Sequence, residues 1–157
     1  MKWRHLINRQ LYSECQLVAA LNAYYVLTGC IHCHLGDPEY ERLVDLIHAR
    51  DGAAIQVVRA ERDLQIRRAP HPAFTHWTDL RNLAHHPNLP LTMDVWHKRT
   101  GYHRALIVAY SKQCDAIRVA NFPQATTDQG WMFLEDVPAT LIPDTARRCP
   151  FAAYTLR

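Results

Sequence analysis

The chain has 157 residues, of which 48% are hydrophobic and 21% are charged, and its formal net charge at pH 7 is +3. This composition is ordinary for one globular domain with a hydrophobic core. The basic residues form short pairs, at 67–68 and 147–148, and not a continuous stripe, which argues against a nucleic-acid partner. With no internal repeat, low-complexity tract or Gly/Ser-rich linker, we expect a single domain over residues 1–157.

The N-terminal sequence has no long apolar run and no small-residue cleavage site, unlike a secretory signal peptide. The most apolar segment, residues 17–27, is too short to span a bilayer and contains Asn22. We therefore expect a cytoplasmic protein without a membrane span. The five cysteines are an odd number, and a reducing compartment predicts free thiols.

Helices dominate the first half of the predicted structure. Ser13 fits the N-cap of a helix over 13–28, with Gln16 completing a capping box and Gly29 as the stop signal. This helix is apolar almost all round, so it should be buried. Further elements are a surface helix at 38–50, which begins after Asp37 and ends before Gly52, a helix at 53–61, a strand at 63–68 and a helix at 77–86.

Strands dominate the second half. Runs of β-branched, aromatic and alternating apolar residues predict strands at 91–97, 103–110, 116–122 and 152–157. The order of helices first and a sheet afterwards indicates an α+β fold. We expect a helical lobe over about residues 1–88 and a β lobe over about residues 89–157.

Cys15 lies in the first turn of the long buried helix. Unpaired backbone N–H groups and the helix dipole favour an anion there, so a thiolate would have a lowered pKa. The N–H of Cys15 could also face a developing oxyanion. A buried cysteine that packs like a small apolar side chain is an equally good interpretation of the position alone.

His103 opens an apolar strand and differs in this from most of the ten histidines. If 103–110 and 116–122 form a hairpin centred on Lys112, Asn121 lies opposite His103 on the same face of the sheet. The Asn121 amide could then orient the imidazole toward a thiol. A polar pair at the end of a sheet, without a chemical role, is the alternative.

Four stretches in this order resemble the papain-like cysteine peptidase superfamily, and most closely its small bacterial C39-type double-glycine leader peptidases and their stand-alone relatives. They are ECQLVAALNAYYVLTG at 14–29, GYHRALIVAY at 101–110, VANFP at 119–123 and GWMFLEDV at 130–137. The resemblance implies a papain-like fold, in which a helical lobe with a buried nucleophile helix packs on a C-terminal antiparallel sheet.

The resemblance further implies Cys15 as nucleophile, His103 as general base and acid, and Asn121 as the residue that orients His103. Gln10 is the candidate for the glutamine that completes the oxyanion hole, although it lies one residue closer to the nucleophile than is usual in the family. Gln16 is a second departure, because a small residue usually follows the nucleophile.

We therefore expect a cysteine peptidase of narrow specificity that cleaves a peptide or isopeptide bond in a peptide or protein substrate, without a cofactor or metal. A related thiol acyltransferase or deamidase would use the same groups. A catalytically inactive papain-like module that binds peptides is the alternative from another class, favoured by Gln16 and by the displaced Gln10.

The segment CIHCH at 30–34 matches the pattern of covalent haem attachment. Zinc bound by Cys30, Cys33 and either His32 or His34 is a more plausible use of these residues, but no second ligand pair with zinc spacing follows. A loop that happens to contain them is the interpretation we favour.

Overall fold

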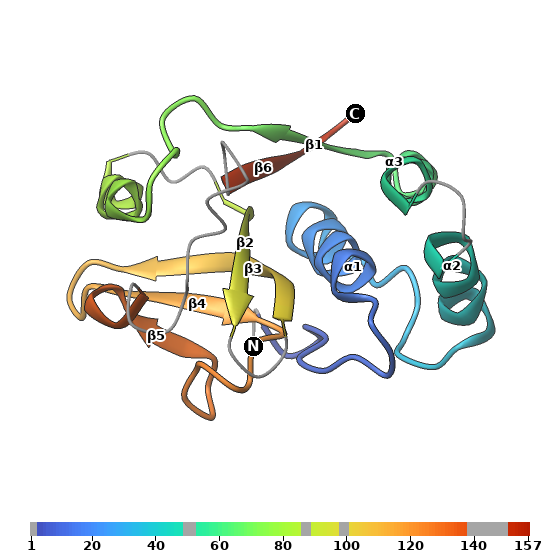
Figure 1. The fold of residues 1–157 in the computed structure, drawn as a ribbon, viewed down its shortest axis with the longest axis horizontal. Helices are drawn as coiled ribbons and strands as arrows, with labels where there is room; N and C mark the ends of the chain where they lie inside the picture. Colours follow the sequence, from blue (N-terminus) through green and yellow to red (C-terminus); the bar gives the residue numbers. More distant parts are fainter. Residues whose placement is uncertain (1–2, 49–52, 86–88, 98–100, 138–150) are drawn as a thin grey trace.

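The computed structural model describes residues 3–48, 53–85, 89–97, 101–137 and 151–157. These residues form an α+β fold in which helices pack beside an antiparallel sheet (Figure 1). The predicted α+β class is confirmed. The helices are α1 (Cys15–Thr28), α2 (Pro38–His48) and α3 (Ala53–Asp63), with short 3₁₀ helices at Trp77–Ala84 (η1) and Leu134–Asp136 (η2).

The sheet has six strands in the order β1-β6-β2-β3-β4-β5, and all neighbours are antiparallel. The strands run over Ile66–Pro70 (β1), Leu91–His97 (β2), Gly101–Ser111 (β3), Ala116–Ala120 (β4), Trp131–Phe133 (β5) and Phe151–Leu156 (β6). β1 follows the helices in the chain, yet it pairs with the C-terminal strand β6 at one edge of the sheet. The division into lobes near residue 88 stays a prediction.

The beginning of α1 differs from the prediction. The N-cap residue is Glu14 and not Ser13, so Cys15 is the first residue of the helix, and no side-chain cap or capping box forms. The Glu14 carboxylate instead accepts the Tyr12 N–H, at 2.8 and 3.0 Å. The end of α1 is as predicted, because Gly29 adopts φ 73° and its N–H reaches the Tyr25 carbonyl at 2.8 Å.

The predicted hairpin also differs in its register. Ser111 pairs with Ala116 across a turn at residues 112–115, and Leu106 pairs with Ala120 beyond a register shift between Ile107 and Ala109. The pairing of His103 with Asn121 is therefore wrong. The turn is centred between residues 113 and 114 and not on Lys112, which moves the partners by three residues, and the register shift between Ile107 and Ala109 reduces this offset to two.

Two hydrophobic clusters lie on opposite faces of the sheet. Alternate residues of β3 enter different clusters, Leu106 and Val108 on one side and Ala105 and Ile107 on the other. The first cluster joins the sheet to α1, α2 and α3, and Figure 1 shows α1 between the sheet and the other two helices. The second cluster includes Leu80 and Leu83 of η1.

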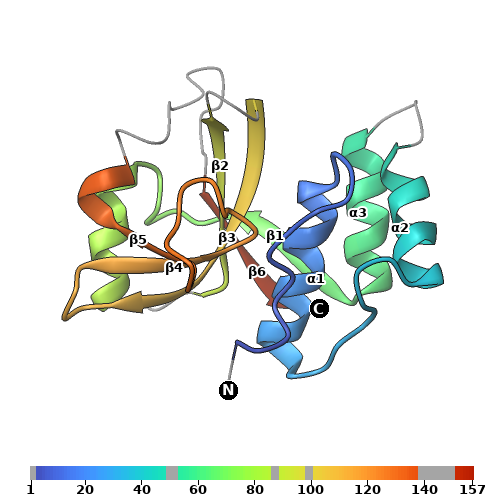
Figure 2. The same cartoon turned by 90° about the horizontal axis from the view of Figure 1, so that it is seen from below.

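The N-terminal segment is fastened to α1 by one buried side chain. Asn22 accepts the Ile7 N–H at 2.8 Å and donates to the Ile7 carbonyl at 2.9 Å. Figure 2 shows this segment running along α1, between the helix and the loop that follows β4. This buried polar residue of a mostly apolar helix thus holds the segment that carries Asn8 and Gln10 beside the sheet.

A buried ion pair lies on the helix side of β2 and β3. Arg104 is 3% exposed, and its guanidinium donates to both carboxylate oxygens of Asp94, at 2.8 and 3.2 Å. Nearby, the Tyr154 hydroxyl donates to Glu61 of α3 at 2.9 Å, which ties that helix to β6. Burial raises the pKa of the Glu61 carboxyl.

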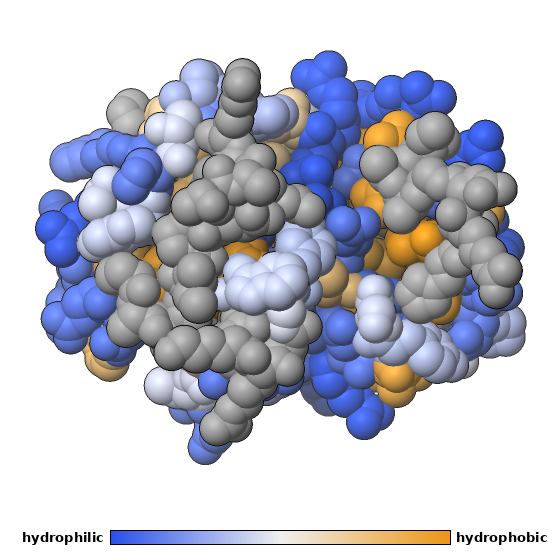
Figure 3. Space-filling model, viewed as in Figure 1, coloured by the Kyte–Doolittle hydropathy of each residue, from blue (hydrophilic) through white to orange (hydrophobic). Residues whose placement is uncertain are grey.

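Hydrophilic side chains cover much of the face shown in Figure 3, and apolar side chains are visible in the region over α2 and α3. None of the helices in the described residues is long and apolar enough to cross a membrane.

Replacing Asp94 by Ala should leave the Arg104 guanidinium buried without its carboxylate partner. We expect this variant to lose about 3–5 kcal/mol of unfolding free energy, measured by urea denaturation. Glu39→Ala, which removes the surface partner of Arg42 and His32, is the matched control and should lose no more than about 1 kcal/mol. Equal stability of the Asp94→Ala variant and the wild type would contradict the assignment of this pair to the core.

Candidate active site

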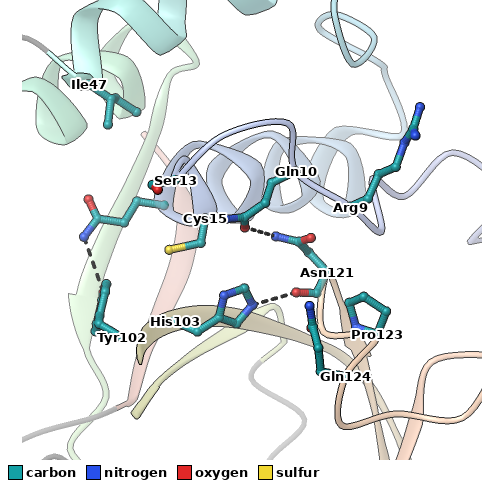
Figure 4. Close-up of a pocket in the computed structure, with 11 residues that line it drawn as sticks. Arg9, Gln10, Ser13, Cys15, Ile47, Tyr102, His103, Asn121, Pro123 and Gln124 are labelled. Carbon is teal, nitrogen blue, oxygen red and sulfur yellow. Dashed lines mark hydrogen bonds between the residues drawn. The ribbon is translucent and has the colours of Figure 1, made fainter. Parts of the chain in front are cut away.

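A cavity of about 430 Å³ opens where the beginning of α1 meets β3 and the loop after β4. The four residues predicted from the sequence, Cys15, His103, Asn121 and Gln10, all line this cavity (Figure 4). Segments more than one hundred residues apart in the chain therefore contribute to one concave site.

Cys15 is the first residue of α1 and is 6% exposed. Its Sγ accepts the backbone N–H of Arg104 at 3.5 Å, so the thiol contacts the residue next to His103. Burial raises the pKa of the Cys15 thiol, and the Arg104 N–H and guanidinium charge oppose this without reversing it. The expectation of a lowered pKa is therefore wrong, because loss of hydration outweighs the favourable position at the helix N-terminus.

His103 lies on β3 and is 7% exposed. Its Nε2 is 2.6 Å from the backbone carbonyl oxygen of Asn121, and its ring packs edge-on against Phe122, with centroids 4.7 Å apart. A carbonyl oxygen only accepts, so Nε2 carries a proton and donates it in this hydrogen bond. In the neutral ring the basic lone pair is then on Nδ1, which Figure 4 shows on the side of the ring toward Cys15.

Asn121 follows the last residue of β4 and adopts a left-handed backbone with φ 60°. Asn tolerates this conformation better than most residues. Its carbonyl faces His103, whereas its side-chain Nδ2 donates to Gln10 Oε1 at 2.9 Å and its backbone N–H donates to Asn8 Oδ1 at 3.4 Å. The contact with the imidazole thus comes from the main chain, where the sequence predicted the amide.

Gln10 is held from both sides. Its Oε1 accepts from Asn121, and its Nε2 donates to the Tyr12 carbonyl at 2.9 Å. A primary amide has two N–H donors, so this bond occupies one of them. Figure 4 shows the Gln10 amide beside Cys15.

Tyr102 lies on the other side of Cys15 from Asn121 in Figure 4. The Gln16 Nε2 donates to the Tyr102 hydroxyl at 3.4 Å, so this contact connects α1 with β3 across one end of the cavity. Sequence reasoning identified Gln16 as an unusual neighbour of the nucleophile but missed Tyr102, Arg104, Asn8 and Phe122. Three of these four directly adjoin His103 or Asn121 in the chain, which is the signal that could have identified them.

The CIHCH segment does not form a metal site in the described part of the chain, where no three His, Cys, Asp or Glu side chains converge. His32 Nε2 instead lies 3.3 Å from Glu39. Cys33 is buried, and loss of hydration raises the pKa of its thiol to about 11.

Comparison with solved structures identifies a protein with a similar fold. No family model matches the chain, and no curated protein matches it. Among solved structures, the peptidase domain of Streptococcus ComA, described as a bi-functional ABC transporter involved in a quorum sensing pathway, matches 98% of this chain and 98% of its own. The TM-score is 0.61 and the sequence identity is 12%. The chain has the fold of this peptidase domain, and the papain-like, C39-like architecture expected from the sequence is confirmed.

Proposed function

We propose that the protein is a cysteine peptidase, with Cys15 as nucleophile, His103 as general base and acid, Asn121 as the residue that orients His103, and Gln10 as an oxyanion donor. The observation that carries this proposal is the buried contact of 2.6 Å between His103 Nε2 and the Asn121 carbonyl oxygen. The Nε2–H donates a hydrogen bond to the Asn121 carbonyl oxygen, and the basic nitrogen, Nδ1, is on the side of Cys15. The cytoplasmic location stays a prediction.

The reaction follows from these roles. His103 Nδ1 takes the thiol proton as Sγ attacks the substrate carbonyl carbon. The oxyanion that forms is stabilised by the backbone N–H of Cys15, which as the first helical residue has no intrahelical partner, and by the Gln10 amide. The imidazolium then protonates the leaving amine, and a water molecule, deprotonated by His103, hydrolyses the thioester.

The raised pKa of Cys15 specifies the resting state of this mechanism. A buried thiol that loses hydration stays protonated at neutral pH, so the proton moves to His103 when the substrate is attacked. This differs from a preformed thiolate–imidazolium pair. His103 is then essential as general base, because only a small fraction of Cys15 is thiolate in the free enzyme.

Narrow specificity is supported by the contact across the cavity. The hydrogen bond between Gln16 and Tyr102 limits the width of the cavity at one end, next to the nucleophile. A substrate must either fit within this limit or separate the two side chains. A selective peptide or isopeptide substrate suits such a site better than unstructured protein in general.

A module that binds peptides without cleaving them is the second candidate. The observation in its favour is the low exposure of Cys15 together with its raised pKa, which reduces the reactivity of the thiol.

Deamidation and acyl transfer form the same acyl-enzyme as hydrolysis. They differ from it in the leaving group or in the molecule that receives the acyl group, so analysis of the products distinguishes the three reactions.

Replacing Cys15 by Ala should abolish cleavage, with a loss of about 10⁴-fold or more, because no other group can form the acyl-enzyme. Mass spectrometry of a proteome-derived peptide library before and after incubation measures cleavage, and urea unfolding verifies the fold. Cys30→Ala, which removes an exposed thiol outside the cavity, is the control and should cleave like the wild type. Cleavage that survives in Cys15→Ala would exclude the proposed nucleophile.

The alkylation rate of Cys15 should rise only above the ordinary pKa of a free thiol, about 8.5. Because burial stabilises the protonated form, the thiolate fraction at pH 7 is smaller than that of free cysteine. Iodoacetamide labelling from pH 5 to 10, resolved by peptide mapping in wild type and His103→Ala, measures this. Fast labelling of Cys15 below pH ~6 that is lost in His103→Ala would instead indicate a thiolate–imidazolium pair.

A further inference from the structure

We propose that Asn121 positions the site in two ways at once: its main-chain carbonyl orients His103, and its side-chain amide holds Gln10. This inference rests on the proposed function for its kinetic consequences, but not for its structural ones. Asn121 is then a positioning residue that couples the base to the oxyanion donor, and its amide is not the group that orients the imidazole.

The main chain and the side chain of Asn121 form hydrogen bonds with different residues. The carbonyl oxygen lies 2.6 Å from His103 Nε2, and this is a buried contact. The side-chain Nδ2 donates in another direction, to Gln10 Oε1 at 2.9 Å, as Figure 4 shows. The carboxamide that bonds to Gln10 is directed away from the imidazole. His103 and Gln10 therefore contact different atoms of Asn121.

The backbone conformation explains why the carbonyl is available. The last pair of the β3–β4 ladder is Leu106 with Ala120, so Asn121 lies just beyond the ladder. Its φ of 60° turns the chain out of the extended conformation of β4. Most residues with a side chain adopt this region with difficulty, whereas Asn and Gly adopt it readily.

The backbone N–H completes the attachment. It donates to Asn8 Oδ1 at 3.4 Å, so the N-terminal segment contacts both the main chain and the side chain of Asn121. The Nε2 of the Gln10 amide also donates to the Tyr12 carbonyl. A movement of Asn121 would therefore displace both His103 and Gln10, which is how one residue couples the two groups.

Two substitutions separate the roles. Asn121→Gly keeps the left-handed backbone and its carbonyl but removes the amide, whereas Asn121→Val keeps the carbonyl but strongly disfavours the left-handed backbone. Proton–nitrogen correlation spectra of the imidazole report which ring nitrogen of His103 carries the proton, and they do not require turnover. We expect the Nε2–H tautomer to persist in Asn121→Gly and to be lost in Asn121→Val.

Loss of the Nε2–H tautomer in a folded Asn121→Gly variant would overturn the proposal, because the amide would then be the orienting group. Persistence of this tautomer in a folded Asn121→Val variant would overturn it as well. Because the tautomer is measured in the absence of substrate, this test stands even if the protein proves to have no peptidase activity.

Kinetics test the coupling to Gln10. Gln10→Ala and Asn121→Gly should each reduce kcat/KM by about 10²–10³-fold, as expected for loss of one oxyanion donor. The double variant should be no slower than the slower single variant, since both changes remove the same interaction. A double variant whose loss equals the product of the two single losses would show that Asn121 and Gln10 act independently.

Discussion

The hydrogen bond from His103 Nε2 to the Asn121 carbonyl is the interaction on which the candidate site depends. It requires β4 to end at Ala120, so that the next residue can turn its carbonyl toward β3. It also fixes the proton on one ring nitrogen, and the other nitrogen then lies on the Cys15 side. Without this bond the imidazole could adopt either tautomer, and only one of them can accept a proton from Cys15 through Nδ1.

The rest of the fold supports this bond from two directions. Asn22, inside the apolar helix α1, holds the N-terminal segment against the helix through both polar groups of Ile7. That segment brings Gln10 to Asn121. On the other side, the ion pair of Asp94 with Arg104 ties together β2 and β3 beneath the helix, and the Arg104 N–H contacts the Cys15 thiol. Polar side chains within the core thus determine where the reactive groups lie.

The sequence predicted the α+β class and most of the elements, because helix and strand patterns are local. Cys15 and His103 stood out by their positions in these elements, whereas Gln10 was named only through the resemblance to papain-like cysteine peptidases. The sequence did not predict the register of the β3–β4 hairpin, since the polar residues 111–115 do not specify where the turn is centred, and the shift between Ile107 and Ala109 adds a further change. It also gave the wrong direction for the pKa of Cys15. The position of a residue in a helix can be read locally, but burial depends on the packing of β3, almost ninety residues away in the chain.

The most direct test of the central claim is covalent capture by a library of peptidyl electrophiles, with the adduct located by peptide mapping. A peptide bound in the cavity would present its electrophile to Cys15, with His103 taking the proton. The account predicts an adduct on Cys15, and not on the exposed Cys30 or Cys114, that is lost in His103→Ala. Adducts confined to exposed cysteines, or labelling of Cys15 that is independent of His103, would contradict it.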